Sequence, residues 1–580
     1  MNRMKLNGAV LVALLGLLAW PGASFAQVTK DQLEAAGAKL QAPRAFFNKL
    51  PDQQRRMLSG SALNFFHVVQ EWPNLQRQVL RGQMSLPSNL LTDSSSSDLS
   101  QSDVATTLAP VAVSKTSTDF AFGPAVGFTQ SETSTAWCGN NVVVGFNDSG
   151  SFFQSGVATA GASLSFNGFA RSTNQGVSFM DEGFLPSVTA NAFNFLEGDP
   201  VVACTSASTF YYSSLFFTAT SVSSLSAISV SKSTNGGVSF GAPVIAAAKN
   251  ANTHFLDKDW MAVNPANPNQ IAVTYTDFDV SGSICATSER TAIELVASFD
   301  GGMTWSAPQV IFQACSTSPN FPSVQGSQVA FSPSGAVNVA FELYSGALPT
   351  GRRIEFNRAA TLGGAFGATV AVANVLGVGD GFAIQGGIRA FVDIQGMAVD
   401  RSGLSTNNNI YIVFHDSTNF VKLFGGNDYG YADAMIAKST NNGTTWSVPV
   451  QVNTNTEPLL TGLGTDSYMP GVAVDNTNGE VGVCWYDRRN DPVNFKVDRF
   501  CGHSLDAGAT FTNQRMTTAS FMPIHGADDL VNPSYFGDYD TVASDSLKAT
   551  NGFIGAFQVV RGAGGTSLVP NSDVKARNFN

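Results

Sequence analysis

The stretch Ser298-Phe-Asp300-Gly-Gly302-Met-Thr304-Trp305 decides the fold of this chain, because its pattern recurs along the sequence. The shared pattern is Ser-x-Asp/Asn-x-Gly-x-Ser/Thr-Phe/Trp. Further copies begin at Ser172, Ser233, Ser439 and Ser504, and a decayed copy keeps Ala359, Thr361, Gly363 and Phe366. Successive copies begin 61 to 80 residues apart. That period suits one four-stranded β-propeller blade per copy, with loops of variable length.

Each position of the pattern has a physical role in a tight turn. The Asp or Asn side chain accepts backbone N–H groups of its own turn, and the Gly takes a backbone conformation closed to other residues. The closing aromatic side chain is expected to anchor the turn by packing between neighbouring sheets. The pattern therefore predicts an all-β structure and says nothing about chemistry.

A second recurring feature counts the blades. Short strands of small apolar residues recur seven times, around Thr135-Ala136-Trp137, Val201-Val202-Ala203, Trp260-Met261-Ala262, Gln328-Val329-Ala330, Gly396-Met397-Ala398, Gly471-Val472-Ala473 and Thr541-Val542-Ala543. The chain ends soon after the seventh strand, so strands near Val111 to Phe128 are expected to complete that blade and close the ring. Seven blades are therefore favoured, with six as the alternative.

The chain divides into four segments. Residues 1–26 carry Arg3 and Lys5, then an apolar run, then Ser24-Phe25-Ala26, which predicts a signal peptide cleaved after Ala26. Residues 27–91 contain helix formers interrupted by Pro43, Pro51 and Pro73, which predicts a helical segment of two or three short helices. Residues 92–104 read as a Ser-rich linker and residues 105–580 as the propeller.

The helical segment carries eight basic residues against four acidic ones, whereas the whole chain has a formal net charge of −11. Two interpretations stay open. The segment is either a peripheral decoration or a lid or pro-segment that docks on the acidic propeller. The acidic balance argues against a nucleic-acid partner. After the signal peptide no apolar run reaches the ~20 residues of a membrane helix, so we expect a secreted or periplasmic protein.

Six cysteines in an exported protein favour disulfide bonds. Cys484 and Cys501 fall on the second and third strands of one blade, where they can face each other across a hairpin. Cys285 and Cys315 fall in loops at one face of the propeller. Cys138 and Cys204 end the inner strands of adjacent blades. We predict these three pairs.

The repeated pattern is the Asp-box, and on its copies the chain resembles the bacterial secreted sialidase-like Asp-box (BNR repeat) propellers over roughly residues 105–575. The resemblance implies a β-propeller and suggests action on glycans as a sialidase-like glycoside hydrolase. The same box occurs in propellers with unrelated activities, so function has to be argued from the site.

Strand direction predicts where acidic residues gather. The box joins the third and fourth strands at one face, so the first strand begins and the second strand ends at the opposite face. Before or on first strands lie Glu132, Asp199, Asp257, Asp259, Asp393, Asp466, Asp538 and Asp540, and at the ends of second strands lie Asp148, Asp277, Asp279, Glu342, Asp416 and Asp487. The sequence therefore predicts an acidic channel mouth, although aspartates at strand ends also form ordinary turns.

We expect Asp487, Asp538 and Tyr539 to be catalytic: Tyr539 attacks or hydrogen-bonds the sugar, Asp538 modulates its proton and Asp487 is the acid/base. Side chains expected to bind substrate are Arg488, Arg389, Tyr535, Asp199 and Asp259. The alternative is a structural ion pair between Asp487 and an arginine, with Tyr539 packed as an aromatic of the inner strand.

Sialidase-like sites clamp the substrate carboxylate with three arginines. The first of these sits early in the propeller, but this chain has no arginine between Arg81 and Arg171. Sialic acid and other glycans therefore both remain candidate substrates. The alternative function is a non-catalytic propeller that binds glycan or protein, with or without the help of calcium. Calcium is considered because Asp277-Phe-Asp279-Val-Ser281-Gly282 is similar to the start of a calcium loop.

Overall fold

The computed structural model of the chain describes most of the propeller and its N-terminal helices. The described residues are 37–80, 109–115, 128–151, 155, 163–186, 192–285, 289–316, 322–346, 351–379, 383–390, 393–422, 428–455, 464–524, 526, 528, 531, 535–561 and 571–580. The predicted signal peptide, the Ser-rich linker and residues 81–91 lie outside them. Among the described helices, none combines the length and the apolar character that crossing a membrane requires.

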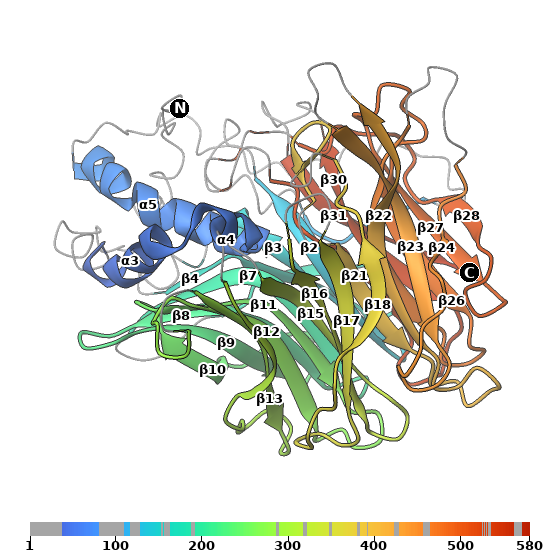
Figure 1. The fold of residues 1–580 in the computed structure, drawn as a ribbon, viewed down its shortest axis with the longest axis horizontal. Helices are drawn as coiled ribbons and strands as arrows, with labels where there is room; N and C mark the ends of the chain where they lie inside the picture. The colour runs from blue at the N-terminus through green and yellow to red at the C-terminus, as the bar shows by residue number, and fades with distance from the viewer. Residues whose placement is uncertain are drawn as a thin grey trace.

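Seven sheets of four or five strands form a β-propeller, which confirms the predicted fold and the larger blade count (Figure 1). Blades 1 to 4 consist of the following strands: β2 (Gln130–Cys138), β3 (Asn141–Asp148), β5 (Asn167–Ser172) and β6 (Met180–Phe184); β7 (Phe193–Cys204), β8 (Phe210–Ala219), β9 (Ser224–Ser233) and β10 (Val244–Asn250), with β4 (Ser163–Ser165) added parallel to β7; β11 (His254–Val263), β12 (Ile271–Asp279), β13 (Arg290–Ser298) and β14 (Gln309–Cys315); β15 (Ser323–Phe331), β16 (Val337–Tyr344), β17 (Arg352–Ala359) and β18 (Val370–Val375).

Blades 5 and 6 follow a two-stranded hairpin of β19 (Ala383–Ile384) and β20 (Ile388–Arg389). Their strands are β21 (Ile394–Val399), β22 (Ile410–Lys422), β23 (Asp428–Ser439) and β24 (Val450–Gln451), then β25 (Ser467–Val474), β26 (Val481–Asp487), β27 (Asp498–Ser504) and β28 (Thr512–Arg515).

The seventh blade closes the ring with both ends of the propeller. It contains β29 (Val542–Ser544), β30 (Phe553–Arg561), β31 (Asn571–Phe579) and, from the other end of the sequence, β1 (Val111–Ala112). Strand β1 pairs antiparallel with β31, with Val111 opposite Ala576. This pairing confirms the predicted completion of the last blade, and it ties the start of the propeller to its end.

The box turns lie between the third and fourth strands of blades 1 to 6, as predicted. In the first copy the amide of Gly176 donates to Ser172 Oγ over 2.9 Å, and the amide of Ser178 donates to Asn174 Oδ1 over 3.0 Å. Gly176 has φ +81°, a conformation that only glycine adopts without strain. The closing aromatic of the fifth blade, Trp446, packs edge-on against Phe356 of the fourth blade, with ring centroids 5.2 Å apart. The turns therefore join adjacent blades.

The inner strands share a second device, a β-bulge near their start. Register shifts occur between Ser131 and Ser134, Gly198 and Val201, Asp257 and Trp260, Gln325 and Gln328, Ile394 and Gly396, and Tyr468 and Gly471. Non-glycine residues within these bulges have positive φ, namely Glu132 (53°), Asp199 (53°), Lys258 (52°) and Met469 (52°). A bulge re-aims the side chain of its extra residue. These bulges belong to the end of the propeller where the acidic side chains gather.

In the described part of the chain, three helices precede the propeller: α3 (Gln41–Lys49), α4 (Asp52–Met57) and α5 (Gly60–Leu80). Helix α4 begins after Pro51, as the sequence predicts. Pro43 does not interrupt a helix, because it lies in the first turn of α3, where a proline is tolerated. The expected break at Pro73 is wrong, because α5 continues through it. A proline leaves the carbonyl four residues earlier without its helical donor. That carbonyl belongs to Val69, and the guanidinium of Arg44 donates to it.

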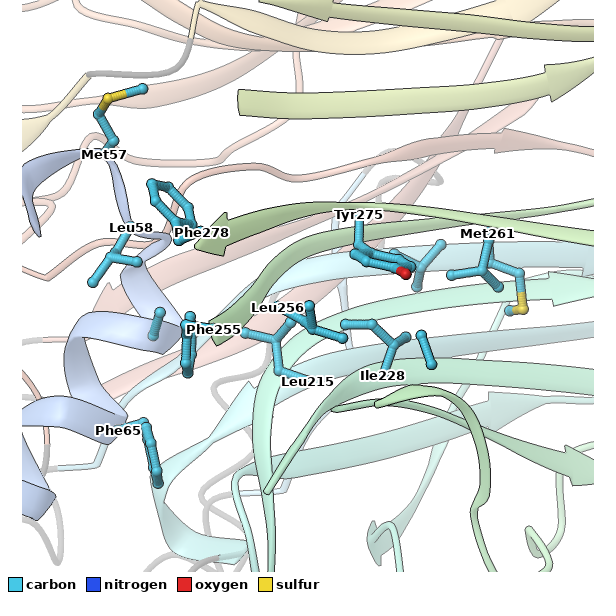
Figure 2. Packing of buried hydrophobic residues seen from close by; sticks show 14 of the residues in the cluster. Met57, Leu58, Phe65, Leu215, Ile228, Phe255, Leu256, Met261, Tyr275 and Phe278 are labelled. Atoms are coloured by element: carbon cyan, nitrogen blue, oxygen red, sulfur yellow. The ribbon is translucent and has the colours of Figure 1, made fainter. Parts of the chain in front are cut away.

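The helices share one apolar core with the second and third blades (Figure 2). Phe65 of α5 packs against Phe195, Phe217 and Phe255, with ring centroids 5.5, 5.6 and 6.2 Å apart. Figure 2 shows Leu58 between the helices and Phe278 of β12. We call the contact of Phe46, Phe65 and Phe66 with these two blades the aromatic anchor. Its buried rings hold the helical segment against the end of the propeller where the inner strands begin.

All three predicted disulfides are present: Cys138–Cys204, Cys285–Cys315 and Cys484–Cys501. The first joins the inner strands of blades 1 and 2. The third joins directly paired residues of β26 and β27. Three disulfides in one chain are consistent with an extracellular or periplasmic protein.

Candidate functional site

Six acidic residues converge where the inner strands of four blades begin, and we call this group the cup. Glu132 comes from blade 1, Glu197 and Asp199 from blade 2, Asp257 and Asp259 from blade 3, and Asp538 precedes the inner strand of blade 7. All six are buried, with Asp199 and Asp257 at 0% exposure and Asp538 at 6%. Burying this many carboxyl groups is costly unless they are paired or protonated.

The start of α5 closes the cup. The amide of Ser59 donates to Asp257 Oδ2 and the amide of Gly60 to Asp538 Oδ2, both over 2.8 Å. Ser61 Oγ donates to Glu132 Oε2 over 3.0 Å. The first N–H groups of a helix have no partner within the helix and carry partial positive charge. Ser59 and the first two residues of α5 therefore use cup carboxyl groups as their hydrogen-bond acceptors.

Asp538 is the cup carboxylate with the strongest cationic surroundings. Arg389 NH1 lies 3.0 Å and Lys258 Nζ 3.2 Å from Asp538 Oδ2. Burial alone would raise the pKa of Asp538, but Arg389 and Lys258 hold it below its usual range. Arg389 also donates through NH2 to the carbonyl of Arg56, over 2.9 Å. Asp538 is thus an ionised carboxylate at neutral pH.

Glu132 has the opposite tendency. Burial first, and then the neighbouring charge of Asp199, raises the pKa of Glu132 well above its ordinary value. Its Oε1 accepts the backbone N–H of Asp538 over 2.8 Å, and its Oε2 accepts Asn147 Nδ2 over 2.7 Å. Both carboxylate oxygens of Asp199 lack a donor among the described residues. The surroundings of Glu132 therefore favour its protonated form.

Asp257, Glu197 and Asp259 also favour the protonated form. Burial, followed by the charge of Asp199, raises the pKa of Asp257 to about 7. Burial likewise raises the pKa values of Glu197 and Asp259 well above their usual range. One oxygen of each of these three carboxyl groups has no hydrogen-bond partner in the described part of the chain. The closed cup therefore contains more carboxyl oxygens than its donors satisfy.

A small cavity of about 10 Å³ lies beside the cup, lined by Lys258, Asp259, Ser327, Gln328 and Tyr539, among others. Three of its lining oxygens, on Asp259, Ser327 and Gln328, are without a partner within the described residues. The space is sufficient for about one water molecule, and polar groups without partners are what such a water binds.

The two predicted tyrosines lie at the cup as packed, hydrogen-bonded side chains. Tyr539 donates its hydroxyl to the carbonyl of Pro200 over 2.8 Å, and Lys258 Nζ lies 4.8 Å from the centre of its ring. Asn147 Nδ2 lies 2.7 Å from Tyr535 Oη. Burial raises the pKa values of both phenols well above 10, so neither is prepared to act as a phenolate nucleophile in this arrangement.

The structure places Asp487 and Arg488 in separate clusters of blade 6. The carboxylate of Asp487 accepts Trp485 Nε1 over 2.7 Å and pairs with Arg489. Arg488 NH1 donates to Asp466 over 3.1 Å, and its NH2 donates to the carbonyl of Gln385 over 2.8 Å. Of the predicted site residues, the structure therefore brings Asp199, Asp259, Arg389, Tyr535, Asp538 and Tyr539 together. Asp487 forms the ion pair of the alternative, with Arg489, whereas Arg488 pairs with Asp466.

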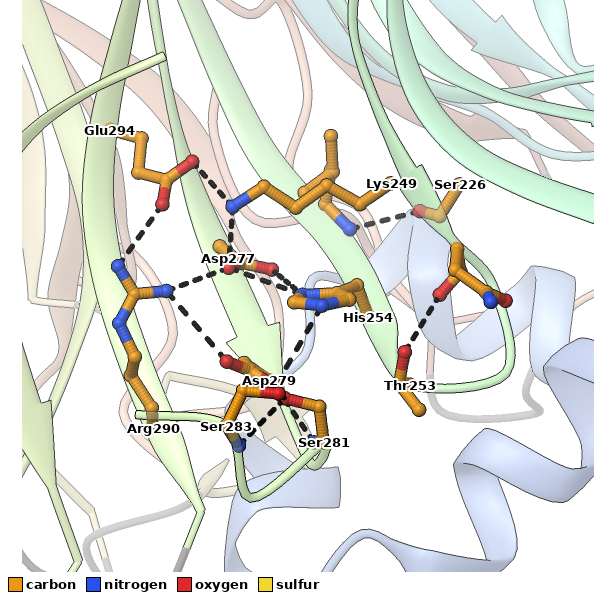
Figure 3. A network of polar contacts seen from close by, with 12 residues as sticks. Ser226, Lys249, Thr253, His254, Asp277, Asp279, Ser281, Ser283, Arg290 and Glu294 are labelled. Carbon is orange, nitrogen blue, oxygen red and sulfur yellow. Dashed lines mark hydrogen bonds and ion pairs between the residues drawn. The ribbon is translucent and has the colours of Figure 1, made fainter. Parts of the chain in front are cut away.

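The predicted calcium residues belong to an ion-pair cluster of blade 3 (Figure 3). Asp277 Oδ2 accepts Lys249 Nζ over 2.7 Å and Arg290 NH1 over 2.9 Å, and His254 Nδ1 lies 3.0 Å from Asp277 Oδ1. Burial opposes ionisation, but His254 and Lys249 lower the pKa of Asp277. Asp279 lies 3.8 Å from His254 Nε2. Calcium binds to oxygen ligands that are free to surround it. Here the carboxylate of Asp277 already accepts Lys249 and Arg290, whose positive charges would repel a calcium ion, so the cluster does not fit calcium.

Sequence reasoning missed Lys258, Glu197 and the helical residues that close the cup. Two signals point to them. The charged runs Glu197-Gly198-Asp199 and Asp257-Lys258-Asp259 stand directly before apolar inner strands. Ser59 precedes a long apolar run and is typical of a helix N-cap. In the structure Ser59 Oγ indeed accepts the amide of Ala62, over 3.0 Å.

Comparison with known proteins gives a likeness of fold. No family model and no curated protein matches the chain. Similar solved structures include an α-L-arabinofuranosidase of Fusarium graminearum with arabinobiose, at 11% identity, 65% coverage of this chain, 91% of that chain and a TM-score of 0.41. A polysaccharide lyase acting on ulvan has 10% identity, coverages of 79% and 95%, and a TM-score of 0.44. A Hadza microbial sialidase has 12% identity, coverages of 71% and 73%, and a TM-score of 0.37.

Proposed function

We propose that this protein is an exported glycoside hydrolase whose chemistry is carried by the cup. The proposal rests on the opposed surroundings of two neighbouring carboxyl groups, the buried Glu132 and the ion-paired Asp538. The environment of Glu132 favours its protonated form, whereas Arg389 and Lys258 keep Asp538 ionised. Two carboxyl groups with pKa values driven apart are what acid and base roles require.

The spacing of the cup suits a glycosidic bond. Three successive residues, Ser59 to Ser61, contact Asp257, Asp538 and Glu132 in turn. Gly60 N lies 2.8 Å from Asp538 Oδ2, and a Cβ atom at Gly60 would lie 3.0 Å from Glu132 Oε1. The carboxyl oxygens of Glu132 and Asp538 therefore lie within about 9 Å of each other. Paired carboxyl groups of glycosidases are separated by about 5–9.5 Å.

In this mechanism Glu132 gives its proton to the glycosidic oxygen as the bond from that oxygen to the sugar carbon breaks. Water adds its oxygen to the sugar carbon, and Asp538 accepts the proton that the water loses. Lys258 and Arg389 hold Asp538 in place. When a sugar replaces the start of α5 it buries Glu132 again, and burial is the main cause of the raised pKa of Glu132.

The donors that the cup already accepts indicate the substrate class. Its carboxyl groups bind two N–H groups and one hydroxyl group of α5. A neutral sugar offers hydroxyl donors of the same kind, whereas a carboxylate sugar would face six acidic side chains. The two cations of the cup, Lys258 and Arg389, are both engaged by Asp538. We therefore propose a neutral glycan in preference to a sialic acid.

The test is a screen of p-nitrophenyl glycosides of neutral sugars and of sialic acid, with and without EDTA, followed by variants. We expect hydrolysis of a neutral glycoside, and Glu132→Gln or Asp538→Asn to lower kcat by about 10²–10⁴-fold. Glu132→Gln nearly preserves side-chain shape, so its melting temperature should stay close to that of the parent protein. Asp538→Asn leaves Lys258 and Arg389 without their carboxylate and should also lower the melting temperature, so its kcat is measured per folded molecule.

Asp300→Asn is the matched control, because Asp300 belongs to a box turn and other copies of the box carry Asn at that position. It removes a charge without touching the cup, so activity should be retained. Full activity of both cup variants would contradict the proposal, as would exclusive cleavage of sialosides. Metal-dependent glycan binding without turnover would favour the binding propeller instead.

A further inference from the structure

We propose that residues 57–61, which we call the tip, form a lid that closes the cup and lifts from it while the aromatic anchor stays docked. As a device that controls access to a catalytic cup, it rests on the proposed function. Opening of the tip, however, can be measured without any substrate. The need for opening follows from burial: Glu132 is 1% exposed and Asp257 is fully buried, so a glycan reaches neither while the tip is in place.

The tip is held by the buried apolar side chains of Met57 and Leu58 and by polar contacts to groups that carry or lose charge. Besides the three contacts to Asp257, Asp538 and Glu132, the carbonyl of Met57 accepts Gln325 Nε2 over 2.8 Å. Gln325 Nε2 also donates to Asp257, over 2.9 Å. Next to the tip, the carbonyl of Arg56 accepts Arg389, the same guanidinium that pairs with Asp538. Ionisation or ligand binding at the cup therefore changes the free energy of holding the tip.

The aromatic anchor is a separate contact of different character. Phe66 packs against Phe255 with centroids 4.8 Å apart, and Phe65 lies against Phe195 and Phe217. These contacts are apolar and hold α5 through its second turn, on the side of blades 2 and 3. Apolar contacts do not respond to protonation. Loss of the polar contacts of the tip thus leaves the rest of the helical segment bound.

The surplus of acidic groups distinguishes a lid from a permanent part of the fold. Two carboxylates, Asp257 and Asp538, already accept the Ser59 and Gly60 amides. In the described part of the chain, the tip donates no hydrogen bond to the carboxyl groups of Asp199, Glu197 and Asp259. Each of these groups keeps at least one oxygen without a partner within the described residues. Permanent burial of such groups opposes stability, whereas a site that opens uses them on a ligand.

Gly60→Leu tests the lid directly. A Cβ atom at Gly60 would lie 2.5 Å from Tyr535 Cε2 and 3.0 Å from Glu132 Oε1, so a side chain there forces the tip away from the cup. Gly60 begins α5 and is not among the residues with positive φ, and leucine is a better helix former than glycine, so α5 itself should persist. Gly367→Leu is the matched control, because nothing lies within 4 Å of a Cβ there.

The readouts are carboxyl footprinting with a carbodiimide and an amine, and hydrogen exchange of the full-length protein. For Gly60→Leu we expect labelling of Glu132 and Asp257 and exchange at the tip to rise by about tenfold or more. Exchange of peptides that contain Phe65 and Phe66 should stay unchanged, as should all exchange in Gly367→Leu. Ser61→Ala, which removes the hydroxyl between Glu132 and Asn147, should give a smaller rise in the same peptides.

Two outcomes overturn the lid. In one, the footprint of Gly60→Leu and Ser61→Ala equals that of the parent protein. In the other, the aromatic anchor and the propeller lose protection together with the tip, which makes the tip an inseparable part of the fold. Turnover decides a different question. An opened cup without hydrolysis of any glycoside contradicts the proposed function and leaves the lid standing, whereas equal turnover of opened and parent protein overturns control by the lid.

Discussion

At the scale of single residues, the cup is built by backbone conformations that ordinary side chains avoid. Glu132, Asp199 and Lys258 all have φ near +53° within bulges of their inner strands. Such conformations cost on the order of 1 kcal/mol or more each and cluster at functional sites. The bulges aim one acid from each of blades 1 and 2 and a lysine from blade 3 at one place. The strain is thus concentrated where the proposed acid Glu132 and the ion pair of Asp538 lie.

Substitution of Tyr539 tests whether this side chain takes part in the reaction or only packs and hydrogen-bonds beside the cup. Its hydroxyl is held by Pro200, and its ring lies against Trp260 with centroids 5.7 Å apart. We expect Tyr539→Phe to lower the free energy of unfolding by about 1 kcal/mol, the usual value of one buried hydrogen bond. Because the hydroxyl does not attack the sugar in our mechanism, kcat should change by less than about threefold. A loss of turnover with an unchanged denaturation midpoint would make Tyr539 the nucleophile that the sequence suggests.

Residue identities alone predicted part of this site. Asp538, Tyr539, Asp199 and Asp259 were expected at the channel mouth because strand direction places them there. The positive φ of Glu132 and Lys258 has no sequence signature, since neither residue is a glycine. Asp487 was expected at the mouth for the same topological reason, but its nearest donors, Trp485 and Arg489, hold it in blade 6.

At the scale of elements, the box turns were predictable because every interaction they need is local. Ser, Asx and Gly hydrogen-bond within five residues, so each copy specifies its own turn. The disulfides were predictable for a related reason, because strand order alone places their partners opposite each other. The start of α5 was not predictable at this scale. Its acceptors, Asp257 and Asp538, lie 198 and 478 residues away in the chain.

Substitution of Trp446 tests how much a box turn stabilises the ring of blades. It is half-buried and packs on Phe356 of the preceding blade. We expect Trp446→Ala to cost about 3 kcal/mol, near the lower end for a buried aromatic side chain, without altering turnover per folded molecule. Thr444→Ala in the same turn changes an exposed residue and should shift stability by no more than about 0.5 kcal/mol. Equal denaturation midpoints for the two variants would show that the turn does not join the blades.

At the scale of the whole molecule, the helical segment and the propeller form one folded unit with one apolar core. The sequence left open whether this segment is a decoration or a lid, because net charge shows attraction but no geometry. The structure shows that the segment covers the cup, through a helix start that faces acidic groups and aromatic rings that face blades 2 and 3. Long-range packing of this kind is specified by side-chain shape, which no local pattern reports.

The closed state should weaken as pH rises. Burial, followed by Asp199, raises the pKa of Asp257 to about 7 in the closed cup, and solvent returns it toward about 3.9 when the tip lifts. A raised pKa stabilises the closed state fully below the ordinary value, and that contribution is lost as pH rises through about 7. Glu132, Glu197 and Asp259 act in the same direction. Asp538, which Arg389 and Lys258 keep ionised, has a lowered pKa and therefore the opposite effect: it weakens the closed state as pH falls. This effect appears only at pH values near and below the ordinary pKa of an aspartate.

Hydrogen exchange of the tip, corrected for the intrinsic rate at each pH, measures this dependence. We expect the protection of the Ser59 and Gly60 amides to fall between about pH 4 and pH 8, while peptides of the aromatic anchor keep theirs. Protection that is constant over this range, or that grows with pH, would show that the cup carboxyl groups stay ionised beneath the tip.

Hydrolysis of a neutral p-nitrophenyl glycoside by three proteins tests the central claim most directly. The proteins are the parent, Gly60→Leu, and Gly60→Leu combined with Glu132→Gln. If the cup is catalytic and the tip closes it, Gly60→Leu hydrolyses the glycoside faster than the parent, and the double variant loses that activity by about 10²-fold or more. Equal rates for Gly60→Leu and the double variant would contradict the claim, because the chemistry would then lie outside the cup.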